Sequence, residues 1–394
     1  MTPIQLLTNV AQLVTPAGVG AARGRDMRAL DITRDAAIAI RDGQVIWCGP
    51  RREWTGAADV EIDAGWCAVV PGLVDPHTHA VWGGDRLADF ESRATGVSYE
   101  ETLAAGGGIR HTVACTTASD TDALLQATLQ RVRRMTRAGA TTIEIKSGYG
   151  FTLEHELRQL AVVRALAALV PATLVPTMLF HLPPRDAAAR VDWMQAAVFE
   201  WMPAIRDAAV GSVDVFIEQD AFSVADAGEL LRAARAQGLQ CKAHTDQFNA
   251  IGGTELAIAH DALSVDHLEA SGPAQIAAIA ASRTAGVLLP GVTLHLHMAA
   301  ADGRALIDAG AVVAVLSRQT NVGTMRAPSH LELTYIGCGD ALASMVAEGA
   351  FPVTGSPTGS RRGAPRVGDG LIRLNSEGEV LYASPNALSA FHRL

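Results

Sequence analysis

The stretch VVPGLVDPHTHAVWGGDR, residues 69–86, places an apolar run directly before two histidines that are separated by one residue. In an extended strand, side chains at positions i and i+2 point to the same face, so His77 and His79 converge at the end of the strand. The aliphatic residues before the pair are typical of a strand buried on both faces, and Gly83 and Gly84 indicate a loop. Parallel α/β folds keep their chemistry at such strand ends, so the pattern favours a metal site over two core histidines.

The segment from Val69 to about residue 350 alternates apolar strand-like runs with Ala- and Leu-rich helical stretches. This alternation is the signature of βα units around a parallel sheet, and eight strands in about 280 residues predict a closed (β/α)8 barrel. The expected strands that follow the one leading to His77 are TTIEIKSGYG (141–150), ATLVPTMLFH (172–181), VDVFIEQD (213–220), QCKAHTDQ (240–247), ALSVDHLE (262–269), GVLLPGVT (286–293) and VVAVLSRQ (312–319).

The two ends of the chain differ from this central pattern. Residues 1–65 contain short strand-like pieces separated by turn signals such as Asp42-Gly43. The tail from Gly355 returns to turns rich in Gly, Ser and Arg with short strands. We therefore expect a small β-sandwich domain formed by residues 1–65 together with 355–394, and a barrel domain formed by residues 66–354.

The composition limits the class of protein. Hydrophobic residues at 49% and charged residues at 19% describe a globular protein with a large core. A net charge of −9 argues against a nucleic-acid partner, and no apolar run approaches the ~18 residues of a membrane span. Five cysteines without a CxxC pair favour a reducing compartment, so we expect a cytoplasmic protein.

Polar residues fall at the C-terminal ends of several expected strands. In a barrel these ends share one rim, so residues that are distant in sequence meet there. The residues concerned are His77 and His79 on the first strand, Lys146 to Tyr149 on the second, His181 on the third, His244, Asp246 and Gln247 on the fifth, and Asp266, His267 and Glu269 on the sixth.

The pattern of His-x-His on the first strand and a later strand-end histidine resembles the amidohydrolase superfamily, and its finer motifs resemble the imidazolonepropionases. Each motif is weak alone, but eight in the family's order over residues 71–324 are specific. The matching stretches are PGLVDPHTHAVWGGDR, GVSYEETLAAGGGIRHTV, GATTIEIKSGYG, HLPP, KAHTDQFNAIGGTELA, SVDHLE, VLLPG and NVGT.

The resemblance implies roles for several of the rim residues. His77, His79 and His244 would hold one Zn²⁺ per chain, with Fe²⁺ or Mn²⁺ as alternatives, and the cation would lower the pKa of water. A substrate carboxylate would be bound by Arg86, whose guanidinium fork matches it, and by Tyr99. The remaining implied residues are Tyr149, His181 and Gln247 around the substrate ring, Gln319 and Asn321 at the substrate rim, and His267, with His181 and Gln247, in catalysis.

The chain departs from the family pattern at the eighth strand. There the family carries an Asp within a motif like Thr-Asp-x-Asn-Pro-Gly, and this chain reads LSRQTNVGT, which places Gln319 at the Asp position. An amide is no general base. Two further differences lie near the expected rim: Thr117, where the family usually has Arg, and an extra His-x-His pair, His295 and His297.

The loss of the carboxyl group suggests altered chemistry. Opening an amide ring expels an amine nitrogen that needs a proton, whereas a thiocarbonyl carbon could expel hydrosulfide, whose acid has a pKa of roughly 7. We therefore favour hydrolytic desulfuration of a thioxo-imidazolidinone propionate, an intermediate expected in ergothioneine breakdown, with release of hydrogen sulfide. The alternatives are a true imidazolonepropionase that opens the ring to formiminoglutamate, and an inactive barrel with a binding role. In each enzymatic case the partner is a small carboxylate substrate, and we expect a homodimer.

Overall fold

The structure is a computed structural model that describes residues 2–18, 20–89, 107–296, 298–316, 372–374 and 380–383. The N-terminal part forms a five-stranded sheet in the order β3-β2-β1-β4, with β5 also paired to β1. Its β2–β3 hairpin turns at Asp42 and Gly43, which both have positive φ, as a tight hairpin turn requires. The strands are β1 Gln5–Pro16, β2 Leu30–Arg41, β3 Gln44–Pro50, β4 Val60–Asp63 and β5 Ala68–Val69.

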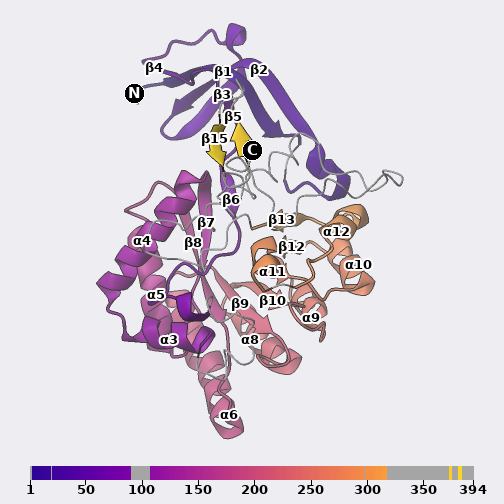
Figure 1. The fold of residues 1–394 in the computed structure, drawn as a ribbon. Helices are drawn as coiled ribbons and strands as arrows, with labels where there is room; N and C mark the ends of the chain where they lie inside the picture. Colours follow the sequence, from indigo (N-terminus) through magenta and orange to yellow (C-terminus); the bar gives the residue numbers. More distant parts are fainter. Residues whose placement is uncertain are drawn as a thin grey trace, which may run out of the picture. The chain divides into compact units, whose positions relative to one another are not determined.

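The central part confirms the predicted parallel barrel. Eight parallel strands follow one another in sequence order from β6 to β13 and curl into a nearly closed barrel (Figure 1). Among the described residues, no strand pairing joins the two end strands, β6 and β13. The strands are β6 Leu73–Asp75, β7 Ala140–Lys146, β8 Thr173–Phe180, β9 Ser212–Ile217, β10 Gln240–Thr245, β11 Ser264–His267, β12 Ala285–Leu288 and β13 Val313–Val315.

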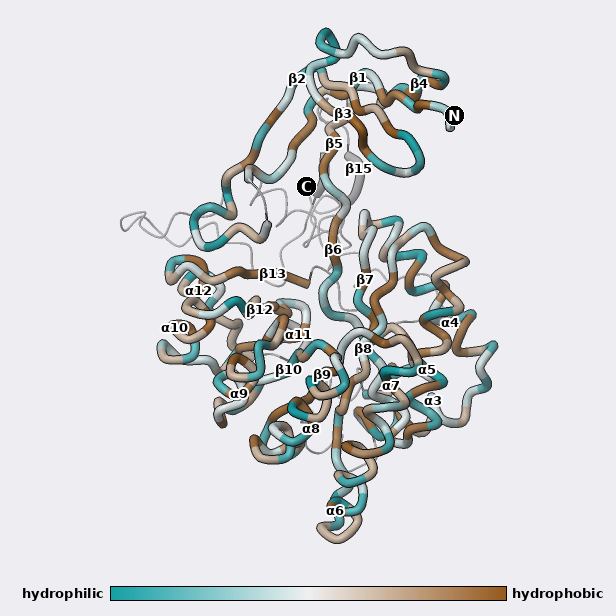
Figure 2. Tube along the Cα trace, turned by 180° about the vertical axis from the view of Figure 1, so that it is seen from behind, coloured by the Kyte–Doolittle hydropathy of each residue, from teal (hydrophilic) through white to brown (hydrophobic). Residues whose placement is uncertain are grey.

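Helices connect these strands and cover the outside of the barrel. Hydrophobic and hydrophilic residues alternate along them, as expected of helices with one face against a sheet (Figure 2). The helices are α3 Ile109–Ala118, α4 Thr121–Arg137, α5 Leu153–Leu166, α6 Ala187–Ala196, α7 Met202–Asp207, α8 Val224–Ala236, α9 Gly253–Ala259, α10 Pro273–Ala281, α11 Pro290–Leu296 and α12 Gly303–Ala309.

Two details of the predicted strands are wrong. The first strand ends at Asp75, before His77, and Leu73 and Val74 are more than half exposed because β6 is an end strand of the sheet. The expected strand at residues 286–293 stops at Leu288, and α11 begins at Pro290, whose fixed φ suits the first turn of a helix.

The interior of the barrel is polar. In β9, the residues Val213, Val215 and Ile217 pack into the main hydrophobic core with helix α8, while Asp214 and its even-numbered neighbours face the other way. Barrel interiors are usually filled by branched apolar side chains. Here the interior holds buried charged residues, namely Glu144, Lys146, Asp214, Lys242 and Asp266.

Residues 324–394 form a second compact unit, of which the structure describes the hairpin β14 Ile372–Leu374 and β15 Val380–Ala383. The pairing of this tail with the N-terminal strands, and with it the proposed domain boundaries, stays a prediction. Within the described part of the chain, no helix is long and apolar enough to cross a bilayer.

Candidate metal centre and active site

The segment that carries His77 and His79 leaves β6 but continues beside β7. The Lys146 backbone N–H donates to the Thr78 carbonyl at 2.8 Å, and the Thr78 hydroxyl donates to the Glu144 carbonyl at 2.5 Å. These two bonds fix the residue between the histidines, so both imidazoles turn into the barrel. The predicted convergence of the pair is therefore present, although a loop rather than a strand produces it.

A buried arginine holds the next part of the same segment. Arg131 of α4 donates to the carbonyls of Ala80 and Trp82, at 2.9 and 2.8 Å, and its guanidinium lies 3.4 Å from the centre of the Trp82 ring. The polar backbone of the segment is thereby satisfied away from water. Helix α4 thus helps to set the position of the histidines at residues 77–79.

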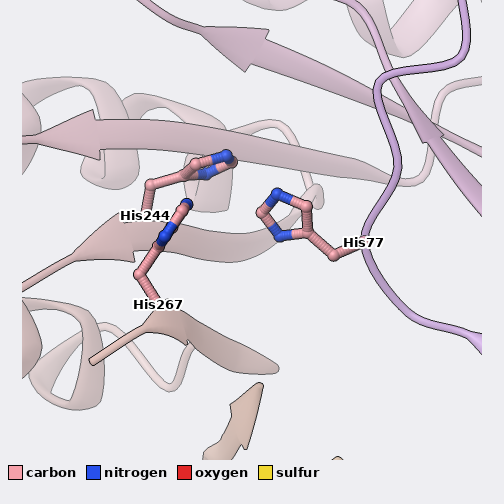
Figure 3. Close-up of side chains that lie close together, drawn as sticks. All are labelled: His77, His244 and His267. Carbon is pink, nitrogen blue, oxygen red and sulfur yellow. The ribbon is translucent and has the colours of Figure 1, made fainter. Parts of the chain in front are cut away.

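Three imidazole nitrogens meet at one point. The Nε2 atom of His79 lies 3.2 Å from Nε2 of His77 and 3.3 Å from Nε2 of His244, which comes from β10. His267, at the end of β11, brings a fourth imidazole, and one ring nitrogen of each of His77, His244 and His267 lies within 4.8 Å of the others. Figure 3 shows the rings of these last three turned toward one another.

Two carboxylates determine the tautomers of two of these rings. Nδ1 of His77 lies 2.6 Å from Oδ2 of Asp266, and Nδ1 of His244 lies 2.9 Å from Oδ1 of Asp214. A carboxylate can only accept, so each Nδ1 carries the proton and each Nε2 presents a lone pair. The close Nε2 atoms therefore include two acceptors that cannot hydrogen-bond to one another.

The arrangement fits a bound metal cation. Burial, followed by the neighbouring Lys146 and imidazoles, holds the pKa of His77 well below its usual range, and burial with neighbouring imidazoles does the same for His79. Neutral imidazoles are the form that binds metal. A proton on His79 Nε2 could be donated to only one of the two neighbouring Nε2 atoms, whereas a cation would accept the lone pairs of all three Nε2 atoms. Nδ1 of His79 is itself buried and has no hydrogen-bond partner among the described residues.

The backbone around His267 is unusual. His267 and Leu268 both have positive φ, 89° and 71°, which non-glycine residues adopt at a cost and which is concentrated at functional sites. This conformation lets Asp266 and His267, although adjacent, both reach the metal-binding region. The carboxylate of Glu269 is buried 3.5 Å from Nδ1 of His267, and within the described part of the chain it has no hydrogen-bond partner.

Two predicted substrate residues lie beside the histidines. The His181 ring, directly after β8, stacks on His79 with 5.7 Å between ring centres, and Tyr149 is 5.8 Å from His79 and 5.6 Å from His181. The Gly148 carbonyl is 3.3 Å from Nδ1 of His181, and burial lowers the pKa of His181 to about 4. His181 is therefore a neutral ring at physiological pH.

Arg86 is half-buried in the loop that follows the histidine pair. Its Nε donates to the Thr112 hydroxyl at 2.7 Å, and Asp85 instead accepts from the Leu87 backbone N–H. No ion pair joins Arg86 to Asp85 among the described residues. Arg86 is close enough to His181 for its charge to contribute to the lowered pKa of that ring.

For the other predicted site residues, the structure gives little or no information on their side-chain contacts. Gln247 is half-buried in the turn after β10, next to Asp246 with its positive φ. Tyr99, Gln319 and Asn321 lie outside the described residues, as does His297. The roles predicted for all of these remain predictions.

The sequence interpretation missed the charged layer under the histidines. Asp214, Glu144 and Lys242 received no role, and Lys146 was noted only as a strand-end residue, yet all four are buried and linked to the imidazoles. The available signal was the alternation of charged and apolar residues in IEIK (143–146) and VDVF (213–216), which places the charges on one face of each strand.

Known proteins resemble this chain closely. It is 53% identical over 311 residues to an imidazolonepropionase of Deinococcus deserti, an alignment that covers 79% of this chain and 76% of the relative. The chain belongs to the imidazolonepropionase family. An imidazolonepropionase of Chloroflexus aggregans is 46% identical over 350 residues, covering 84% of this chain and 80% of that one. No protein-family model matches the chain.

Solved structures agree on the fold. A triazine hydrolase variant superimposes with a TM-score of 0.58 at 13% identity, over 81% of this chain and 72% of that chain. A guanine deaminase of C. acetobutylicum gives 0.54 at 12% identity, over 88% and 81%. Membership of the imidazolonepropionase family makes the protein a hydrolase of the amidohydrolase superfamily, so the inactive-barrel alternative is set aside.

Proposed function

We propose that this protein is a metal-dependent imidazolonepropionase, which adds water to imidazolone propionate and opens the ring to formiminoglutamate. The observation that carries the proposal is the meeting of the Nε2 atoms of His77, His79 and His244 at 3.2 and 3.3 Å, with two of them fixed as lone-pair donors. The relatives at 53 and 46% identity bear the name of this activity.

This proposal revises our expectation of a thioxo substrate. That expectation rested on Gln319, where the family carries Asp, and the relatives give it no support. The ring amide of the oxo substrate loses its nitrogen only if a proton reaches it. His267, which lies beside the three histidines and whose Nδ1 is 3.5 Å from the Glu269 carboxylate, is the described residue placed to hold that proton.

The metal would be held by His77, His79 and His244, and we propose zinc, for which three imidazole ligands are common. When bound, it would supply the Lewis acidity that activates water near neutral pH. The protein's own residues would orient the substrate: Arg86 would bind the propionate carboxylate through its guanidinium fork. The neutral ring of His181 would lie against the imidazolone ring.

The test is to incubate the purified protein with imidazolone propionate and with its thioxo analogue. We expect loss of ring absorbance and formation of formiminoglutamate, detected by mass spectrometry, from the oxo substrate. His244→Ala should lose both metal and activity, whereas His260→Ala, whose side chain is outside the cluster, should keep both.

Two results would overturn the proposal. One is full activity after exhaustive removal of metal by a chelator. The other is release of sulfide from the thioxo analogue, measured with a colorimetric trap, without ring opening of imidazolone propionate. The second result would restore the thioxo substrate and show that the chain lacks a proton donor for a departing amine.

A further inference from the structure

Lys146 is one of the largest fully buried side chains of the described residues, with no exposed surface. Its ammonium group lies 2.6 Å from Oδ2 of Asp214, 2.8 Å from Oε2 of Glu144 and 3.4 Å from Oδ2 of Asp266. A buried ammonium group is costly unless it is paired, and here three carboxylates from three different strands surround it. Lys146 therefore links β7, β9 and β11 inside the barrel.

Two of these carboxylates also orient histidines. Asp266 accepts from Nδ1 of His77 through the same Oδ2 that faces Lys146. Asp214 accepts from Nδ1 and from the backbone N–H of His244 through Oδ1, at 2.9 and 3.1 Å, and uses Oδ2 for Lys146. One ammonium group thus contacts both of the carboxylates that fix the tautomers of two candidate metal ligands.

The second buried lysine does not make this link. Lys242 contacts Glu144 at 2.8 Å and the Pro76 carbonyl at 3.2 Å, and it is 3.8 Å from Asp266. Among the described residues, Lys242 forms no hydrogen bond or ion pair with Asp214, which orients His244. Lys242 balances charge in the same layer. Of the two lysines, only Lys146 contacts both of the aspartates that orient metal-site histidines.

We propose that Lys146 is a positioning residue for the metal centre: it holds Asp214 and Asp266 in place, and through them it sets the orientation of His244 and His77. This inference rests on the metal site of the proposed function. Without the Lys146 ammonium group, the carboxylates of Asp214 and Asp266 repel one another in a low-dielectric interior and turn away from one another. Each imidazole would then lose the acceptor that keeps its Nε2 lone pair directed at the metal.

The charge state of Lys146 agrees with this role. Burial by itself lowers the pKa of the ammonium group, but Asp214, Glu144 and Asp266 outweigh that effect and keep the pKa above its ordinary value. Lys146 is therefore in its charged form at neutral pH, as a link between the two aspartates requires.

The experiment replaces Lys146 by methionine, which keeps most of the side-chain length, in the full chain. Zinc affinity is measured by competition with a chromogenic chelator, and the visible spectrum of the cobalt-substituted protein reports the ligand geometry. We expect zinc affinity to fall by about 10- to 100-fold, which is typical when a residue that orients a metal ligand is lost. The cobalt spectrum should also change. The matched control, Lys242→Met, should weaken zinc binding less and leave the cobalt spectrum close to that of wild type.

A purely structural role would destabilise the protein without these effects. A folded Lys146→Met protein with wild-type zinc affinity and cobalt spectrum would overturn the role of Lys146. If the single variant does not fold, Lys146→Met with Asp214→Asn removes both charges of the closest pair and is the less damaging change. Wild-type zinc affinity in that double variant would also overturn the inference, whereas absence of zinc binding by the wild type would instead overturn the metal site itself.

Discussion

Glu156 of α5 should determine both the stability of the barrel and the place of Tyr149. Its buried carboxylate accepts from three backbone N–H groups of the loop after β7: Gly148 at 2.6 Å, Gly150 at 2.7 Å and Phe151 at 2.9 Å. Burial raises the pKa of Glu156, and these hydrogen bonds oppose the increase. Glu156 therefore accepts most of the backbone hydrogen bonds of the loop that carries Tyr149, and Gln159 accepts one more, from the Tyr149 N–H at 3.4 Å.

The size of the effect follows from these three bonds. Each buried donor left without an acceptor costs about 1–3 kcal/mol, and water can reach the partly exposed Phe151 end of the loop. We expect Glu156→Ala to lower the free energy of unfolding by about 3–5 kcal/mol. Glu156→Gln should cost less, because its amide oxygen can still accept while its NH₂ group cannot.

The assay is urea unfolding of the full chain, with Glu154→Ala as the control. Glu154 is exposed in the first turn of the same helix, so its loss should change the stability by less than about 0.5 kcal/mol. Because Tyr149 moves with its loop, the surviving folded Glu156→Ala enzyme should also have a higher KM. A loss of stability below about 1 kcal/mol would refute the assignment of Glu156 as the main hydrogen-bond acceptor of this loop.

Three further predictions follow from the site. Arg86→Lys should raise KM strongly in steady-state kinetics while the metal content stays constant, because a point charge cannot form the two-pronged contact with a carboxylate; an unchanged KM would exclude Arg86 from the substrate site. Asp214→Asn should weaken zinc binding by about 10- to 100-fold in chelator competition, and the exposed Asp220→Asn should not. For His181, whose folded pKa of about 4 lies below that of the unfolded chain, only the unfolded state gains a proton as pH falls from about 6.5 to 4. Its contribution to stability is therefore complete above pH 6.5 and is lost below it, so His181→Asn should reduce the difference in unfolding free energy between pH 7 and pH 5 by about 2 kcal/mol, and an unchanged difference would contradict the lowered pKa.

Local patterns in the sequence predicted the elements of the fold well. The apolar runs at residues 141–150, 172–181 and 213–220 became β7, β8 and β9, and the Asp42-Gly43 signal became a hairpin turn. Strand ends were less predictable, because a strand stops where its hydrogen-bonding partner stops. Leu73 and Val74 have the composition of a buried strand, but they lie at the end of the sheet and are exposed.

The candidate site was predictable where the spacing alone fixes geometry. His77 and His79 are two residues apart, and any extended backbone brings their side chains to one side. The partners of the imidazoles depend instead on the register between strands. Asp214 meets His244 because β9 and β10 pair with Asp214 opposite Lys242, and no pattern within either strand contains that alignment. The orienting carboxylates could therefore be identified only from the structure.

The same register places a layer of buried charged residues next to the three histidines of the proposed metal site. The layer under them holds three carboxylates, Glu144, Asp214 and Asp266, and two ammonium groups, which leaves an excess of one negative charge away from water. A fourth carboxylate is not readily accommodated in its charged form, since burial and then Glu144 raise the pKa of Asp75 to about 7. The buried layer has an excess of negative charge, and the Nε2 lone pairs of His77 and His244 point away from the carboxylates that orient these rings. A cation bound at these Nε2 atoms would therefore stabilise the layer. The metal would therefore neutralise the excess negative charge in the barrel interior. Its removal should change the positions of Lys146, Asp214 and Asp266 as well as those of the metal ligands.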